Sequence, residues 1–352
     1  MRGRFVGLRQ LAWASAWLLV SAAVVCAWSA ATGSPTEPTA GWVYPYFREL
    51  RLRSPGCPFF VSTGPYERLD VASWLRRGCE GGSPEGARAE WLRGMLDVEY
   101  APEAAAGESA SPVVTFVTAP GLGLRTDRRA KPEMLTNLTV YSPKGVSLWT
   151  SFRATANAPE NHKVGTKQWH GPWRASLDHG GAGYRNGGFS IFLGRDEVSW
   201  GASRERGLLF SGAAPSMDMV KFSFTHKNLC FTSLHSQLRS SAADQWAPSV
   251  RRFVSAHRLE YLPGRRWGFS LSEAVIYGGE GRGFSLGYLN PMAPFYAEQW
   301  NSRSDDNILM AGDVSFLLPG RIDVRAEVVV DDFQLDFKTC LLYTSPSPRD
   351  CS

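Results

Sequence analysis

Between about residues 112 and 337, apolar and polar residues alternate in segments of roughly ten residues. The stretch 220–225 (Val-Lys-Phe-Ser-Phe-Thr) alternates without a break. Turn sequences such as 185–188 (Arg-Asn-Gly-Gly) and 263–264 (Pro-Gly) separate these segments. A period of two residues between turn signals is typical of an antiparallel sheet.

The face opposite the apolar one indicates what kind of sheet this is. Within 267–277 one set of alternate residues is large and apolar, with Glu273 as the exception: Trp267, Phe269, Leu271, Val275 and Tyr277. The other set is small rather than rich in Lys and Glu: Gly268, Ser270, Ser272 and Ala274. This pattern favours an outer-membrane β-barrel with a polar lumen, whose strands must all be paired in lipid. On alternation alone, a secreted soluble β-protein remains an alternative.

Before this region the periodicity is helical. Residues 42–98 predict a small helical element, including a helix near 69–77 and another beginning at Ser83, a suitable N-cap followed by Pro84. Residues 32–41 and 99–112 lack a clear period and are expected to be linkers. The partial barrel is expected to span 113–339.

Both ends of the chain are expected not to belong to the fold. Residues 1–31 have arginines, then a long apolar run, then small residues, the order of a secretory signal peptide. Residues 340–352 include a string (Cys-Leu-Leu-Tyr-Thr-Ser-Pro-Ser-Pro-Arg-Asp) that matches a translated sequencing adapter. We therefore expect a non-native tail and a natural protein that continues beyond residue 339.

Charge and cysteine usage narrow the functional classes. The formal net charge is +5, but three arginines lie in the signal, which leaves about +2 for the mature part. So small a charge argues against a nucleic-acid partner. The 43 aromatic residues (13 Trp, 11 Tyr, 19 Phe) suit membrane-interface girdles or sugar-stacking surfaces. Cys57 and Cys79 are a candidate disulfide in an exported segment, whereas Cys230 lies between apolar residues and is expected to be packed.

A series of short motifs carries a resemblance to a known family. They are Trp42–Leu50, Thr63–Arg68, Val71–Leu75, Gly194-Arg195, Trp200-Gly201, Leu208–Pro215, His257–Glu260, Ser272–Gly279, Tyr288–Gln299, Asp305–Asn307 and Asp331–Gln334. In order and spacing they resemble the capsule-assembly Wzi family over nearly all of residues 42–337. Each motif is weak alone, and the ordered set is more specific.

The resemblance implies an outer-membrane β-barrel with a small amino-terminal helical element. It implies a non-catalytic role in binding or organising capsular or related surface polysaccharide, in contact with outer-membrane lipid and with capsule-export machinery as a further possible partner. No cofactor or metal is expected. The Cys57/Cys79 pair and the region 101–132 depart from the family pattern, and the ligand of distant members is open.

The candidate ligand-binding and lumenal residues are polar or aromatic. They are Trp169, Trp173, Arg195, Trp200, Arg258, Glu260, Glu273, Tyr277, Asn290, Asp306, Asn307, Asp331 and Asp332. A lumenal network of carboxylates with Arg195, Arg258 or Arg325 is expected, because charges removed from water need partners.

Two other functions remain open. A polysaccharide-active enzyme would need paired carboxylates, but adjacent aspartates on a strand, such as Asp331 and Asp332, point to opposite faces. A passive pore is the other alternative. The glycine-rich stretch 278–283 resembles a nucleotide loop but lies between strands, so we interpret it as a hairpin turn.

Overall fold

The computed structural model describes residues 43, 44, 47, 62–77, 94, 97–108, 110–124, 130–156, 168–203, 207–238, 251–264, 266–279, 281–302, 304, 306–320 and 322–331. Several predictions from the sequence lie outside these residues: the signal peptide, the linker at 32–41, the Cys57/Cys79 pair, Asp332 and the carboxy-terminal tail.

The described elements are mainly long strands. In chain order they are β1 (Thr63–Gly64), α3 (Arg68–Arg77), α5 (Ala101–Glu108), β2 (Val113–Leu124), β3 (Ala130–Tyr141), β4 (Val146–Ala156), β5 (Gln168–His170), β6 (Trp173–Asn186), β7 (Phe189–Asp196), β8 (Ser199–Trp200), β9 (Met217–His226), β10 (Leu229–Leu238), β11 (Arg251–Tyr261), β12 (Trp267–Gly279), η2 (Gly287–Leu289), α6 (Phe295–Ser302), β13 (Asn307–Leu318) and β14 (Ile322–Asp331).

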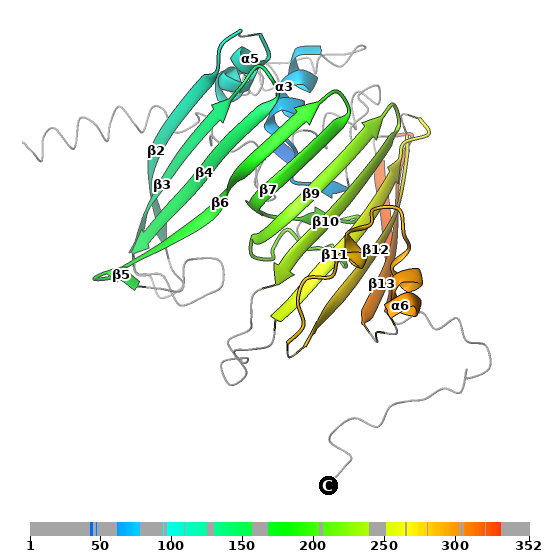
Figure 1. The fold of residues 1–352 in the computed structure, drawn as a ribbon. Helices are drawn as coiled ribbons and strands as arrows, with labels where there is room; N and C mark the ends of the chain where they lie inside the picture. Colours follow the sequence, from blue (N-terminus) through cyan, green and yellow to red (C-terminus); the bar gives the residue numbers. More distant parts are fainter. Residues whose placement is uncertain are drawn as a thin grey trace, which may run out of the picture.

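Twelve strands form one curved antiparallel sheet (Figure 1). Its order is β14-β13-β12-β11-β10-β9-β7-β6-β4-β3-β2, with the short β5 paired to β6. Successive strands are neighbours, so the connections alternate between the two ends of the sheet. Short turns at 142–145, 187–188, 227–228, 262–266 and 319–321 share one end, which we call the turn end. The other connections, at 125–129, 157–172, 197–216, 239–250 and 280–306, share the opposite end, the loop end, and all of them except 125–129 are longer than any of these turns.

The convex face of the sheet carries a belt of exposed apolar side chains. Cross-strand pairing aligns them in rows, and one such row, from β7 to β14, runs Phe189, Phe224, Phe231, Leu259, Leu271, Gly312 and Val328. Leu271 is 57% exposed and Val328 is 59% exposed. Such rows confirm the alternation predicted from the sequence. The expected turns at 185–188 and 263–264 are also present.

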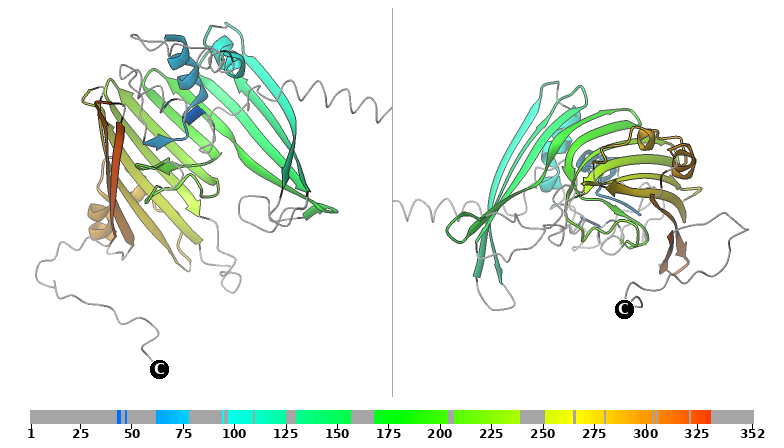
Figure 2. Two further views of the ribbon diagram at one scale, coloured as in Figure 1. Left: turned by 180° about the vertical axis from the view of Figure 1, so that it is seen from behind. Right: turned by 60° about the horizontal axis from the view of Figure 1, so that its bottom comes forward.

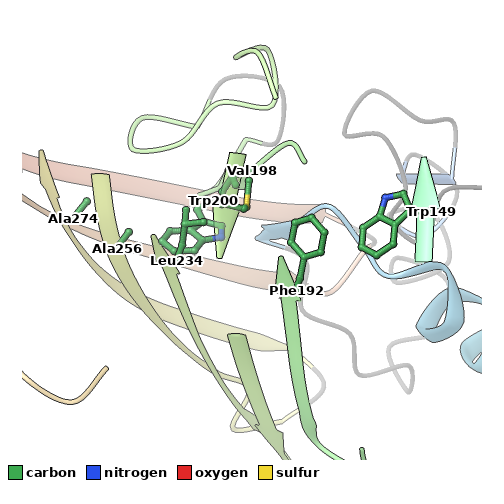
Figure 3. Close-up of a cluster of buried hydrophobic side chains, with 8 residues drawn as sticks. Trp149, Phe192, Val198, Trp200, Leu234, Ala256 and Ala274 are labelled. Atoms are coloured by element: carbon green, nitrogen blue, oxygen red, sulfur yellow. The ribbon is translucent and has the colours of Figure 1, made fainter. Parts of the chain in front are cut away.

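The concave face is covered by other parts of the chain. β1 pairs with β8, and both lie inside the curve of the sheet (Figure 2). Trp200 of β8 is fully buried in a cluster that also contains Leu234, Ala256 and Ala274 of the wall (Figure 3). Trp149 and Phe192 stack in the same cluster with their ring centroids 4.8 Å apart. The connection between β7 and β9 therefore folds back into the concavity.

The amino-terminal helices lie at the turn end (Figure 1). α3 agrees closely with the helix expected near 69–77. Residues 99–112, expected to be a linker, instead contain α5. Its sequence, Ala-Pro-Glu-Ala-Ala-Ala-Gly-Glu, combines high helix propensity with proline in the first turn, and the buried ion pair between Glu103 and Arg68 holds it in place.

A second difference concerns the glycine-rich stretch at 278–283. The sequence predicts a hairpin turn there, but β12 and β13 are joined by a 27-residue connection, residues 280–306, that contains η2 and α6. α6 lies on the convex side of the sheet, opposite β1 and α3, as the front and back views show (Figures 1 and 2). Within the described part of the chain, none of the helices has both the length and the apolar character required to traverse a membrane.

Candidate functional site

Arg258 of β11 is the centre of a buried polar cluster on the concave face. Its guanidinium donates to Asp313 Oδ2 at 2.8 Å and to Ser272 Oγ at 2.9 Å, both in the wall. It also donates to Thr63 Oγ1 at 2.8 Å and to Ser62 Oγ at 3.0 Å, in the amino-terminal segment. The cluster thus fastens β1 to the sheet across nearly 200 residues of sequence.

Two further candidates belong to this cluster. Glu260 Oε1 accepts a hydrogen bond from Ser62 Oγ at 3.2 Å and lies 3.6 Å from Arg258 Nη2. The Trp200 ring centroid is 5.8 Å from the Arg258 guanidinium carbon. Arg258, Glu260 and Trp200 are each at most 3% exposed, so they support the inner segments rather than offer a surface to a polymer.

The connection that carries β8 is also tied to the far strand of the sheet. Glu327 of β14 accepts from the backbone N–H groups of Ala202 at 3.2 Å and Leu208 at 3.0 Å. A Cβ on Gly201 would lie 2.3 Å from Glu327 Oε1, and its φ of +128° is itself a glycine conformation. Glycine at this position therefore lets the connection approach the carboxylate closely.

α3 is joined to the sheet near the short turns. Arg185 of β6 pairs with Asp70, donating to Oδ2 at 2.8 Å, and with Glu67. Arg68, fully buried, donates to Glu103 Oε1 of α5 at 2.8 Å, and the same oxygen accepts from Tyr141 of β3 at 3.0 Å. These bonds place both helices against the turn end of the barrel wall.

On the convex face, Asp306 fastens the connection between β12 and β13. Arg282 donates to its Oδ2 at 2.7 Å, and so does the Tyr288 hydroxyl at 2.7 Å. Burial opposes ionisation of Asp306, but hydrogen bonds from Arg282, Tyr288 and Ser304 outweigh it, and the pKa of this carboxyl lies below its ordinary value. Burial raises the pKa of Tyr288 to about 12.

Glu273 and Tyr277 take part in the same arrangement. Glu273 Oε1 accepts from the backbone N–H of Phe295 at the start of α6, 2.9 Å away. Tyr277 packs with Tyr288, Phe295 and Ile308. Glu273, the exception in the apolar series of β12, therefore accepts a hydrogen bond from the first turn of α6.

Four of the candidates lie at the loop end and are accessible. Trp173 begins β6 and is half-buried, while Asn290, Asn307 and Asp331 are exposed. Asn307 begins β13 and Asp331 ends β14, so they share this end of the sheet. Trp169 lies in β5 beside β6, and its side chain is outside the described part.

Of the three arginines expected for a lumenal network of carboxylates, Arg258 and Arg325 take part and Arg195 does not. Arg195 does not join a lumenal network, because it lies in the convex register row of β7 and pairs with the exposed Asp218, donating to Oδ1 at 2.7 Å. Arg258 and Arg325 do face the concave side, and Arg325 donates to Asp323 at 2.7 Å. Glu273 and Asp331 form no carboxylate pair, since β13 separates their strands.

Several interacting residues were missed by the sequence reading. Ser62, Thr63 and Asp313 complete the Arg258 cluster, and Glu67 and Asp70 hold Arg185. Their residue types are common, and only long-range contacts single them out. In the described part of the chain, no group of three His, Cys, Asp or Glu residues is placed to hold a metal ion.

The fold and these clusters define the class of protein. An antiparallel meander with an exposed apolar convex face and a polar, occupied concave face is the wall of a membrane-type β-barrel. The model of the family described as "Capsule assembly protein Wzi" matches residues 135–342, which is more than half of the chain. The chain therefore belongs to the Wzi capsule-assembly family.

A solved structure has a similar fold. It is that of Wzi, described as an outer-membrane protein involved in group 1 capsule assembly in Escherichia coli and as a carbohydrate-binding β-barrel. The TM-score is 0.58 at 13% sequence identity, with 86% of this chain and 65% of that chain covered. This chain thus spans slightly less than two thirds of that protein. No curated protein matches the chain significantly in sequence.

Proposed function

We propose that this protein resides in the outer membrane, where it binds surface polysaccharide during capsule assembly without catalysing a reaction. The observation that carries the membrane part is the apolar belt on the convex face, which extends over most strands of the sheet. A soluble protein rarely exposes so large an apolar surface. Family membership and the likeness to a carbohydrate-binding barrel support the polysaccharide role.

The lengths of the connections support an orientation. In outer-membrane barrels the short turns are periplasmic and the longer loops extracellular. The turn end, with α3 and α5, would then face the periplasm, and the loop end would face the exterior. Exported polysaccharide would meet the loop end first.

The loop end is accordingly where we place polysaccharide contact. Trp173 offers a flat apolar face of the kind that stacks on sugar rings, while Asn290, Asn307 and Asp331 offer exposed hydrogen-bonding groups. The buried Arg258 cluster would hold the inner segments in the bore.

A non-catalytic role is supported by the environment of Glu273. Its carboxylate accepts a hydrogen bond from the Phe295 backbone N–H of α6, next to a packed aromatic cluster. Among the described residues, no second carboxylate lies beside it to form a catalytic pair. Purified capsule incubated with the protein should remain intact, and Glu273→Gln should not change this. Turnover of any capsular glycan that disappears in Glu273→Gln or Asp332→Asn would support the enzyme alternative instead.

The membrane assignment is tested by fractionation. The protein should sediment with outer membranes and migrate faster on gels before boiling than after it. Recovery in the soluble periplasmic fraction would contradict the assignment. Conductance in planar bilayers that is insensitive to added polysaccharide would favour a passive pore.

The ligand site is tested by a matched pair of tryptophans at opposite ends of the sheet. Trp173→Ala should weaken retention of capsular polysaccharide by roughly ten-fold, as the loss of one stacking contact predicts. Trp267→Ala, at the start of β12 near the turn end, should leave retention unchanged. Equal loss in both variants would remove Trp173 from the site.

A further inference from the structure

One part of the convex face carries polar residues at positions where a lipid-facing wall should carry apolar ones. The register row that starts at Ile191 and Phe222 continues through Ser233, His257 and Glu273 before returning to Met310 and Val330. The next row towards the loop end passes from Leu193 and Val220 to His235 and Ser255, then to Val275 and Ile308. We call Ser233, His235, Ser255, His257 and Glu273 the outer polar patch.

The outer polar patch is covered by the chain itself. Ser233, His235, Ser255 and His257 are each at most 8% exposed, although their register rows face outward. Phe295 lies against His257, with ring centroids 4.2 Å apart, and Phe284 lies 6.3 Å from His235. The covering residues belong to the connection between β12 and β13, and we call residues 281–306 the cover segment.

His235 is bonded to other members of the patch, whereas the buried His257 Nε2 has no hydrogen-bond partner among the described residues. The two ring nitrogens of His235 lie 3.0 Å from Ser233 Oγ and 3.0 Å from Ser255 Oγ. Polar groups of this kind are unfavourable in hydrocarbon unless they are bonded and shielded. The cover segment therefore replaces the barrel wall as the outermost layer over part of β10 to β13.

The cover segment exposes large apolar side chains, alongside the smaller polar Asn290, Asn301 and Ser302. Leu286 is 80% exposed, Met292 is 83% exposed and Trp300 is 68% exposed. Between residues 281 and 302 the sequence contains only two charged residues, Arg282 and Glu298, and Arg282 is paired with Asp306. A solvent-facing loop would be expected to carry more charge.

We propose that the cover segment contacts membrane lipid, lying against the outside of the barrel in the outer leaflet and presenting Leu286, Met292 and Trp300 to it. The cover segment borders the apolar belt, since the exposed Leu271 lies on the same face of β12 two residues before Glu273, which bonds to Phe295 of the cover segment. Trp300, beside the polar Asn301 and Ser302 at the end of α6, suits the interfacial level that tryptophan prefers. This inference rests on the proposed membrane location.

Site-specific photo-crosslinking distinguishes a failure of this inference from a failure of the proposed membrane location. Benzoylphenylalanine is placed singly at Leu286, Met292 or Trp300 of the full chain reconstituted in phospholipid bilayers. Leu271 in the belt is the positive comparison. Gly264, in an exposed turn with nothing within 4 Å of an added Cβ, is the negative one. The three cover positions should give lipid adducts about as often as Leu271 and about ten-fold more often than Gly264.

Each other outcome has a distinct meaning. Lipid adducts at Leu271 with none at the three cover positions would overturn this inference and leave the membrane location intact. Adducts between two copies of the chain at the cover positions would overturn it in favour of a barrel–barrel interface. An absence of lipid adducts at all positions, Leu271 included, would refute the membrane location itself.

Discussion

The Arg258 cluster and the outer polar patch bury polar side chains on opposite faces of the same strands. On the concave face, Arg258 is paired with Asp313 and held by the amino-terminal segment, so charge is neutralised by partners far away in sequence. On the convex face, the patch is shielded by the connection that directly follows β12. A polar lumen and a lipid-facing exterior thus require different solutions, ionic pairing inside and coverage outside.

The largest loss of stability is expected when the Arg258 cluster is disrupted. Arg258→Met would leave Asp313 and Glu260 buried without their cation, and removing one partner of a buried pair costs about 3–5 kcal/mol. The free energy of unfolding in lipid vesicles, measured with urea, should fall accordingly. Arg195→Met is the matched control, because its partner Asp218 is 63% exposed at the side chain, and it should change stability by less than about 1 kcal/mol. Similar losses in both variants would refute the role given to Arg258.

The second-largest loss of stability is expected when the cover segment is loosened. Phe295→Ala removes the ring that packs on His257 and Tyr288, and the loss should be about 3 kcal/mol, confined to the cover segment. Protease cleavage within 281–306 should accelerate while the heat-modifiable gel shift of the barrel remains. Unfolding of the whole protein by this substitution would show that the two faces are not independent.

A smaller change is expected from Asp306→Asn. The amide weakens the charge-assisted bonds from Arg282 and Tyr288, and we expect a loss of roughly 1–3 kcal/mol in the attachment of the cover segment. Hydrogen exchange of the α6 amides is the measurement. Asp331→Asn, an exposed carboxylate at the same end of the sheet, should leave that exchange unchanged.

The smallest expected effect is a weaker attachment of the cover segment at acidic pH. Because the pKa of Asp306 is lowered in the folded protein, its contribution is present above the ordinary value of 3.8 and is lost as the pH falls below it through the folded value. Pepsin cleavage within the cover segment, relative to cleavage of an unfolded substrate at the same pH, should increase as the pH falls below about 3.8. Asp306→Asn should remove this pH dependence, and an equally steep profile in that variant would assign the titration to another group.

Much of the barrel wall could be predicted from local pattern. The alternation at 220–225 and 267–277 and the turns at 185–188 and 263–264 specify strands and their two faces, because side chains in a strand alternate with a period of two. The prediction for 278–283 was wrong for a related reason: glycines mark a turn, but they do not indicate how long the connection that follows will be.

The candidate site was predicted only in part. Trp200, Arg258 and Glu260 do meet, yet Ser62, which bonds both Arg258 and Glu260, lies 196 residues from Arg258 and carries no signal of its own in the sequence. Arg195 was expected in the lumen because residue type alone does not give the face. Its register in β7 places it on the convex side.

The sequence by itself determined the strands, the sidedness of the sheet and the resemblance to the Wzi family, since these depend on local periodicity and ordered motifs. Only the tertiary structure decided which outward positions are exposed and which are covered, and which polar residues join Arg258 inside. Those outcomes depend on contacts between segments far apart in the chain and on how the connections fold back, and neither is encoded in a two-residue period.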